Sequence, residues 1–150
     1  MKDMNEDIYI TIYTKERGKL SLTLLEFNSL DTFLTFHRED GPATESIDGH
    51  KVWCIDGNFH REDGPAIENK MYKAWYIKGK VHREDGPAKI YINPKSLNMS
   101  KYWFIEDDVY PEKEFNRLIK EVDSLNPVLG LTDEREWVRE RFKRKLKEVV

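Results

Sequence analysis

The feature that most constrains the fold of this chain is a heptapeptide, HREDGPA, that occurs three times without a change. The copies lie at residues 37–43, 60–66 and 82–88, so their starts are 23 and 22 residues apart. Each copy is followed by a Trp-x-Ile unit, at 53–55, 75–77 and 103–105. Self-similarity at this period indicates one small structural unit that is built several times and packs on its own neighbours.

Turn signals define what this unit is. Asp56-Gly57 and Lys78-Gly79 directly follow the first two Trp-x-Ile units, and glycine in the second place supplies the positive φ of a tight hairpin turn. The Glu-Asp-Gly-Pro run inside each heptapeptide predicts a second turn, because proline cannot donate to a strand ladder. Short strands joined in this way predict an antiparallel meander of about six to eight strands.

The alternation of side chains along a strand predicts two different faces of this sheet. The tryptophan and isoleucine of every Trp-x-Ile unit point the same way, and we expect them to form a core stripe. The opposite face carries side chains that grow larger toward the C-terminus: Val52, Cys54, Ala74, Tyr76, Tyr102 and Phe104. We expect the helices that follow to cover the later part of this second face.

Regular patterns also flank the repeats. Residues 8–12 and 20–24 each alternate apolar and polar side chains and predict an N-terminal hairpin, and residues 30–36 predict a strand that leads into the first heptapeptide. Pro111 begins a predicted helix that ends at Asn126-Pro127, with one apolar face formed by Phe115, Leu118, Ile119, Val122 and Leu125. A second helix is predicted from Thr132 or Asp133 to near Val150.

The expected fold class is therefore α+β, mainly β: an antiparallel meander of tandem β-hairpin repeats with two C-terminal helices. We expect a single domain over residues 1–150. Its parts are an N-terminal hairpin (1–32), a repeat sheet (33–110) and a helical C-terminal cap (111–150).

Composition excludes several classes of function. The 150 residues hold 25 Lys+Arg and 28 Asp+Glu, a formal net charge of -3, which argues against a strongly basic nucleic-acid binder and a strongly acidic nucleic-acid mimic. Arg141 to Lys147 form a weak basic patch, for which a role in complementing a helix C-terminus is favoured.

Cys54 is the only cysteine, so no intrachain disulfide forms. No apolar run approaches the ~20 residues that span a bilayer, and residues 1–10 lack the basic start of a signal peptide, so we expect a cytoplasmic protein without membrane contact.

The heptapeptide contains catalytic residue types, but their arrangement favours a structural role. An enzyme needs one convergent set of groups, whereas these histidines and carboxylates occupy three equivalent positions. No His-x-His, Cys-x-x-Cys or His-Glu-x-x-His spacing occurs. We therefore expect no enzyme activity, no catalytic residue, no metal and no cofactor. The favoured interpretation is that Asp and Gly shape the turn, Pro fixes φ, Ala permits close packing and Arg pairs with a carboxylate.

A binding role fits the same repetition better. Turns aligned along one edge would place the three arginines in a ladder beside the histidines, able to meet a carboxylate-bearing or anionic partner. The candidate binding residues are Arg38, Arg61, Arg83, His37, His60, His82, Tyr76 and Tyr102. The first hypothesis is a non-enzymatic protein-interaction module whose partner is another protein. The alternative is a binding protein that sequesters a nucleotide or another small anionic ligand, built from the repeat arginines and exposed aromatic side chains.

The unit Trp-x-Ile-x-Gly-x-x-His-Arg-Glu-Asp-Gly-Pro-Ala resembles the β-hairpin repeats of MORN-like and YwqK-type proteins. It is most similar to a variant with HRxDGPA signatures that is widespread in bacteriophages and large DNA viruses. The resemblance covers about residues 33–110. It implies an elongated, curved sheet used for binding, and a phage or viral protein that acts on a host defence or takeover target in the host cytoplasm. MORN repeats typically end in Gly-x-Gly, which Asp-Gly-Pro-Ala replaces here, so the lipid and partner specificities of that family do not carry over.

Overall fold

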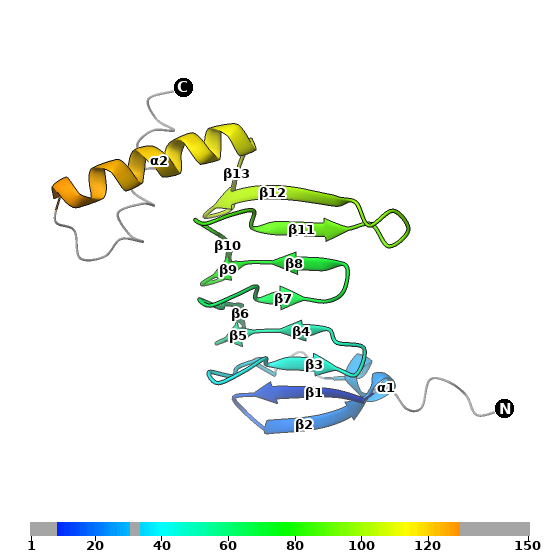
Figure 1. Ribbon diagram of the computed structural model, residues 1–150. Helices are drawn as coiled ribbons and strands as arrows, with labels where there is room; N and C mark the ends of the chain where they lie inside the picture. Colours follow the sequence, from blue (N-terminus) through cyan, green and yellow to red (C-terminus); the bar gives the residue numbers. More distant parts are fainter. Residues whose placement is uncertain (1–8, 31–33, 130–150) are drawn as a thin grey trace.

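The computed structural model describes residues 9–30 and 34–129, and it is mainly β. Nine strands form one antiparallel sheet in the order β13-β12-β11-β8-β7-β4-β3-β1-β2 (Figure 1). The strands of this sheet are β1 (Tyr9–Thr14), β2 (Gly18–Thr23), β3 (Thr44–Ser46), β4 (Lys51–Val52), β7 (Ile67–Glu68), β8 (Tyr72–Ala74), β11 (Lys89–Ile92), β12 (Met99–Ile105) and β13 (Asp108–Tyr110). The predicted antiparallel meander is confirmed.

Two short hairpins stand beside this sheet at the ends of its strands. They pair β5 (Cys54–Ile55) with β6 (Asn58–Phe59), and β9 (Tyr76–Ile77) with β10 (Lys80–Val81). Their turns are those that the sequence predicts: φ is 52° and 75° at Asp56 and Gly57, and 49° and 79° at Lys78 and Gly79. The β12–β13 turn has the same form at 106–107, where φ is 48° and 73° although neither residue is glycine.

The N-terminal segment contains a short helix that the sequence did not lead us to expect. β1 and β2 form the predicted hairpin, but Leu24 begins α1 (Leu24–Asn28). Thr23 and Glu26 form a capping box: the Thr23 hydroxyl accepts the Glu26 N–H at 3.3 Å, and the Glu26 carboxylate accepts the Thr23 N–H at 2.7 Å. The predicted strand over 30–36 is wrong for the residues described, because Phe36 makes only a single bridge, to Thr14.

Many of the buried side chains in the repeats are small, and the expected Trp/Ile core stripe is wrong in most of its members. Of the six residues in that stripe, only Ile105 is buried, and the other five are half-buried. Fully buried instead are residues that let adjacent turns and strands approach closely: Ala43, Ala66, Ala74, Ala88 and Cys54. The tryptophan rings therefore stand at the boundary between core and surface.

The C-terminal helix α2 (Glu112–Leu129) lies at the β13 end of the stack (Figure 1). Phe115 and Leu118 pack into a cluster with Ile105 and Tyr110, and Trp103 joins this cluster from its edge. The helix thus contacts the Trp103/Ile105 side of β12. For α2, the expectation that the C-terminal helices cover the Tyr76/Phe104 side is wrong, because side-chain alternation defines two faces of a strand without determining which face the next helix contacts.

The end of α2 also differs from the prediction. The helix continues through Asn126-Pro127 to Leu129. Pro127 lies in the last turn and removes one backbone N–H donor from the helix there. The predicted second helix lies outside the described residues. No helix in the described part of the chain is long and apolar enough to cross a membrane.

Candidate functional site

The heptapeptide histidines hold the hairpin turns of the following repeat. In each copy Nδ1 accepts the backbone N–H of the first turn residue, which has positive φ. The bonds are Asp56 N–H to His37 (3.1 Å), Lys78 N–H to His60 (3.0 Å) and Glu106 N–H to His82 (3.3 Å). In His60 and His82 an accepting Nδ1 places the proton of the neutral ring on Nε2, whereas His37 Nδ1 also lies 3.0 Å from the Asp56 carboxylate. Nε2 faces the glutamate two residues on, at 3.8, 3.9 and 2.8 Å in the three copies.

The heptapeptide arginines fold back onto their own turns. Each guanidinium donates from Nε to the aspartate two residues on, at 2.7, 2.8 and 2.6 Å, and from Nη1 to the proline carbonyl at 3.4, 3.2 and 3.2 Å. Each also lies over an aromatic ring that precedes its heptapeptide. The pairs and their distances to the ring centroid are Arg38 on Tyr13 (4.0 Å), Arg61 on Trp53 (3.8 Å) and Arg83 on Trp75 (4.0 Å).

The glycine of the heptapeptide makes this arrangement possible. A Cβ at Gly64 would lie 2.9 Å from Arg61 Cζ, and the corresponding distances at Gly41 and Gly86 are 2.8 and 3.1 Å. The guanidinium is therefore held between the turn and the aromatic ring, and there is no room on the turn side for a side chain. Glycine here serves close approach rather than an unusual φ.

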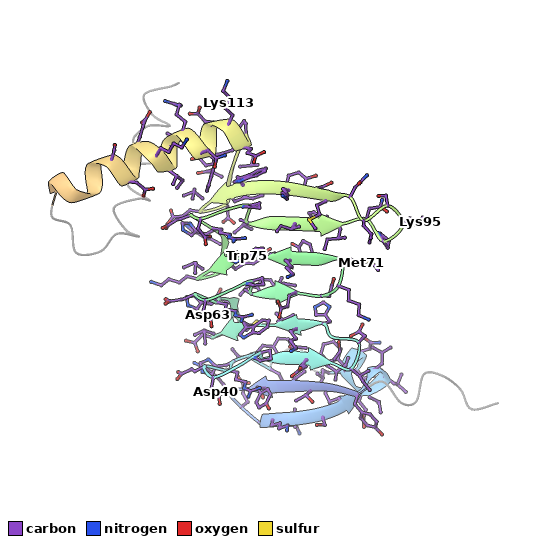
Figure 2. All side chains as sticks on the ribbon, viewed as in Figure 1. Asp40, Asp63, Met71, Trp75, Lys95 and Lys113 are labelled. Atoms are coloured by element: carbon purple, nitrogen blue, oxygen red, sulfur yellow. The ribbon has the colours of Figure 1, made fainter. Side chains whose placement is uncertain are left out.

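This packing shields the basic side chains of the turn edge from solvent and leaves the aspartates exposed. The three arginine side chains are only 22–24% exposed, whereas Asp40, Asp63 and Asp85 are each 84% exposed. The hydrogen bonds from Arg38 and Arg61 hold the pKa of Asp40 and Asp63 below the usual aspartate value. The edge that the sequence analysis pictured as an arginine ladder is thus acidic toward solvent, and Figure 2 shows Asp40 and Asp63 projecting from the same side of the stack.

Two equivalent grooves run between consecutive turns. The first, of about 730 Å³, lies between residues 38–42 and 60–63, with Trp53 and Ile55 also lining it. The second, of about 580 Å³, lies between residues 61–65 and 82–85, with Trp75 and Ile77 in the same role. Arg61, Glu62 and Asp63 belong to both, so the middle turn is a shared wall.

The predicted site residues separate into two groups. All three arginines, together with His60 and His82, line the grooves, whereas His37, Tyr76 and Tyr102 do not. Tyr76 packs against Phe59 with a ring-centroid distance of 5.1 Å, and burial raises its pKa. Tyr102 is 45% exposed and meets Tyr91 edge to face at 5.8 Å.

The sequence did not reveal several aromatic partners of the predicted site residues. Tyr91 joins Tyr72 (4.7 Å) and Tyr102 in a row of contacting rings, and its register opposite Tyr72 follows from strand pairing that a single sequence does not specify. Tyr13, the aromatic partner of Arg38, lies 25 residues before it because β2 and α1 intervene. Trp53 and Trp75 each precede their arginine by eight residues, a constant interval that could have suggested these two pairs.

Within 9–30 and 34–129, no group of three His, Cys, Asp or Glu side chains is placed to hold a metal ion. The basic patch Arg141 to Lys147 lies outside the described residues. No protein-family model, curated protein or solved structure matches the chain.

Proposed function

We propose that this chain is a non-enzymatic protein-interaction module that presents its heptapeptide edge to another protein. One observation carries the proposal: the same groove, walled by the same heptapeptide, occurs twice side by side along this edge. The reactive side-chain types, histidine and arginine, are engaged in holding turns. A surface that repeats at a fixed interval suits an extended partner that can engage both copies together.

The alternative, a protein that sequesters a nucleotide or another small anion, has less support from the geometry. An anion site requires guanidinium donors that point outward. Here each guanidinium already bonds an aspartate and a proline carbonyl and lies on an aromatic ring. The exposed groups beside it are carboxylates, which repel an anion.

A more specific form of this proposal is that the chain is related to MORN-like repeat proteins and is of phage or viral origin. It rests on the HREDGPA signature and on a meander of antiparallel hairpins. In this form the partner is a host protein of a defence or takeover pathway, met in the host cytoplasm.

Site-specific photo-crosslinking in the producing cell tests the proposal. A photoreactive residue at position 62, in the wall that both grooves share, should give a discrete adduct with one protein. The same residue at position 123, exposed on α2, is the matched control and should give none. The absence of an adduct from position 62, or the same products from both positions, would refute an interaction role for this edge.

A further inference from the structure

The charge of the two grooves indicates what kind of segment they accept. Each groove is lined by four carboxylates and two guanidiniums, which leaves two net negative charges with neutral histidines. The carboxylates of the second groove are Glu62, Asp63, Glu84 and Asp85. Since the aspartates are 84% exposed and the arginines 22–24%, the negative charge faces the groove opening. A cation is therefore favoured there over an anion.

The apolar lining adds to this preference. Ile55 and Trp53 line the first groove, and Ile77 and Trp75 line the second. A lysine or arginine side chain has an apolar stem that packs along such surfaces while its charged end remains at a polar rim. A groove with an apolar lining and a carboxylate rim therefore matches one long cationic side chain.

The spacing of the grooves sets the spacing of the cations. The three heptapeptides lead into β3, β7 and β11, and one strand separates each of these from the next. Neighbouring strands are about 4.8 Å apart, so the grooves repeat about every 9.6 Å. A polyproline II segment rises about 3.1 Å per residue with three residues per turn, so every third side chain returns to the same side after about 9.3 Å. An extended β segment places same-side residues about 6.7 Å apart, which does not match.

We propose that the two grooves bind a basic segment of a partner protein in polyproline II conformation, with one lysine or arginine side chain in each groove and the two cations three residues apart. This inference rests on the proposed interaction function and names the chemistry of its partner. The middle turn, with Glu62 and Asp63, faces both cations, so it contributes to both positions.

Fluorescence anisotropy with two isomeric peptides tests the spacing. Both are labelled, proline-rich nonapeptides with three lysines; in one the lysines occupy every third position, and in the other they are consecutive. Titrated with the full chain at low salt, the spaced peptide should bind about fivefold or more tightly, because only it can fill both grooves. Raising the salt should weaken binding, since exposed ion pairs are screened. Equal affinity for both isomers, or no binding of either, would overturn the inference.

A pair of matched variants tests the location. Glu62→Gln with Asp63→Asn removes the shared charges and keeps an oxygen acceptor for Arg61, while Glu112→Gln with Asp123→Asn removes two exposed charges from α2. The first pair should weaken binding of the spaced peptide about fivefold to tenfold, and the second should leave it unchanged. Equal losses in both pairs would overturn the groove assignment. If the first pair fails to fold, the isomer comparison on the unaltered chain still decides. A discrete crosslink from position 62 combined with no peptide binding would overturn only the basic-segment inference.

Discussion

Replacing His60 with alanine removes the acceptor that fixes the hairpin turn at Lys78. The lost bond is Lys78 N–H to Nδ1 at 3.0 Å, and a typical hydrogen bond of this kind contributes about 0.5–1.5 kcal/mol to stability. The His60 side chain is 21% exposed and Lys78 is exposed, so water can satisfy the released N–H. We therefore expect His60→Ala to lower the free energy of unfolding by about 1 kcal/mol, or the melting temperature by about 4 °C.

The third copy of the same contact should cost more to remove. His82 is only 5% exposed, and its two ring nitrogens contact the Glu106 N–H and the Glu84 carboxylate. Water reaches the released groups poorly, and a buried donor left without its partner costs about 1–3 kcal/mol. His82→Ala should therefore destabilise the chain by about 2 kcal/mol, roughly twice the effect at His60.

Two substitutions at His60 separate the hydrogen bond from the packing of the ring. In His60→Asn the amide oxygen can occupy the place of Nδ1 and accept the Lys78 N–H, whereas in His60→Gln the amide oxygen reaches the place of Nε2. Urea unfolding at pH 7.5, followed by circular dichroism and tryptophan fluorescence, should find His60→Asn close to the unaltered chain and His60→Gln close to His60→Ala. Equal stability of the asparagine and glutamine variants would refute the turn-holding role.

Three further predictions concern the middle turn and the core beneath it. Gly64→Ala should lower the free energy of unfolding by about 1–2 kcal/mol, because the added Cβ pushes the Arg61 guanidinium off the Trp53 ring. In a double-mutant cycle measured by urea unfolding, this loss should largely vanish in an Arg61→Ala background. An unchanged loss would contradict the packing of the guanidinium between the turn and the ring. Burial raises the pKa of the Cys54 thiol to about 11, so iodoacetamide at pH 8 should modify the folded chain roughly 200-fold more slowly than the urea-unfolded chain; comparable rates by mass spectrometry would count against the burial. The Arg61 hydrogen bond lowers the folded pKa of Asp63, so the stability that this carboxylate contributes is present above about pH 4 and is lost as the pH falls through the folded pKa. The stability difference from Asp63→Asn, measured from pH 7 to 3, should stay constant down to about pH 4 and shrink only below it; a difference that already shrinks between neutral pH and pH 4 would contradict the pairing.

Local turn chemistry explains how much of the fold the sequence could predict. Asp56-Gly57 and Lys78-Gly79 determine their own φ values, so the hairpins and the meander followed directly. α1 was also within reach, because Thr23 and Glu26 have the spacing of a capping box, but the apolar alternation through Leu24 favoured a strand. The sequence could not predict which side of β12 is covered by α2, because this depends on the path of the chain through β13 and not on side-chain alternation.

The arginines show where prediction of the site failed in a physically instructive way. The heptapeptide places one base beside two acids, and the sequence alone does not show which of the three side chains is buried. In the structure, Arg61 can stack on Trp53 and bond two groups of its own turn at once, and no acid of the heptapeptide has a comparable apolar surface to cover. Burial therefore selects the base for the interior, and the same residues that predicted an anion site produce an acidic edge.

The glutamate of the heptapeptide links this edge to its proposed partner. Direct contacts account for the other polar positions: histidine accepts a turn N–H in every copy, arginine bonds aspartate in every copy, and a glycine Cβ would meet the arginine in every copy. The glutamates differ in exposure: Glu39, Glu62 and Glu84 are 81%, 62% and 28% exposed. All three are nevertheless glutamate: each faces the Nε2 of the histidine two residues before it, and each also lines a groove. If the glutamates serve to bind a cation in the groove, Glu39→Gln should weaken binding of the spaced peptide and leave the melting temperature unchanged. A loss of stability without a loss of binding would instead show that this glutamate stabilises the fold.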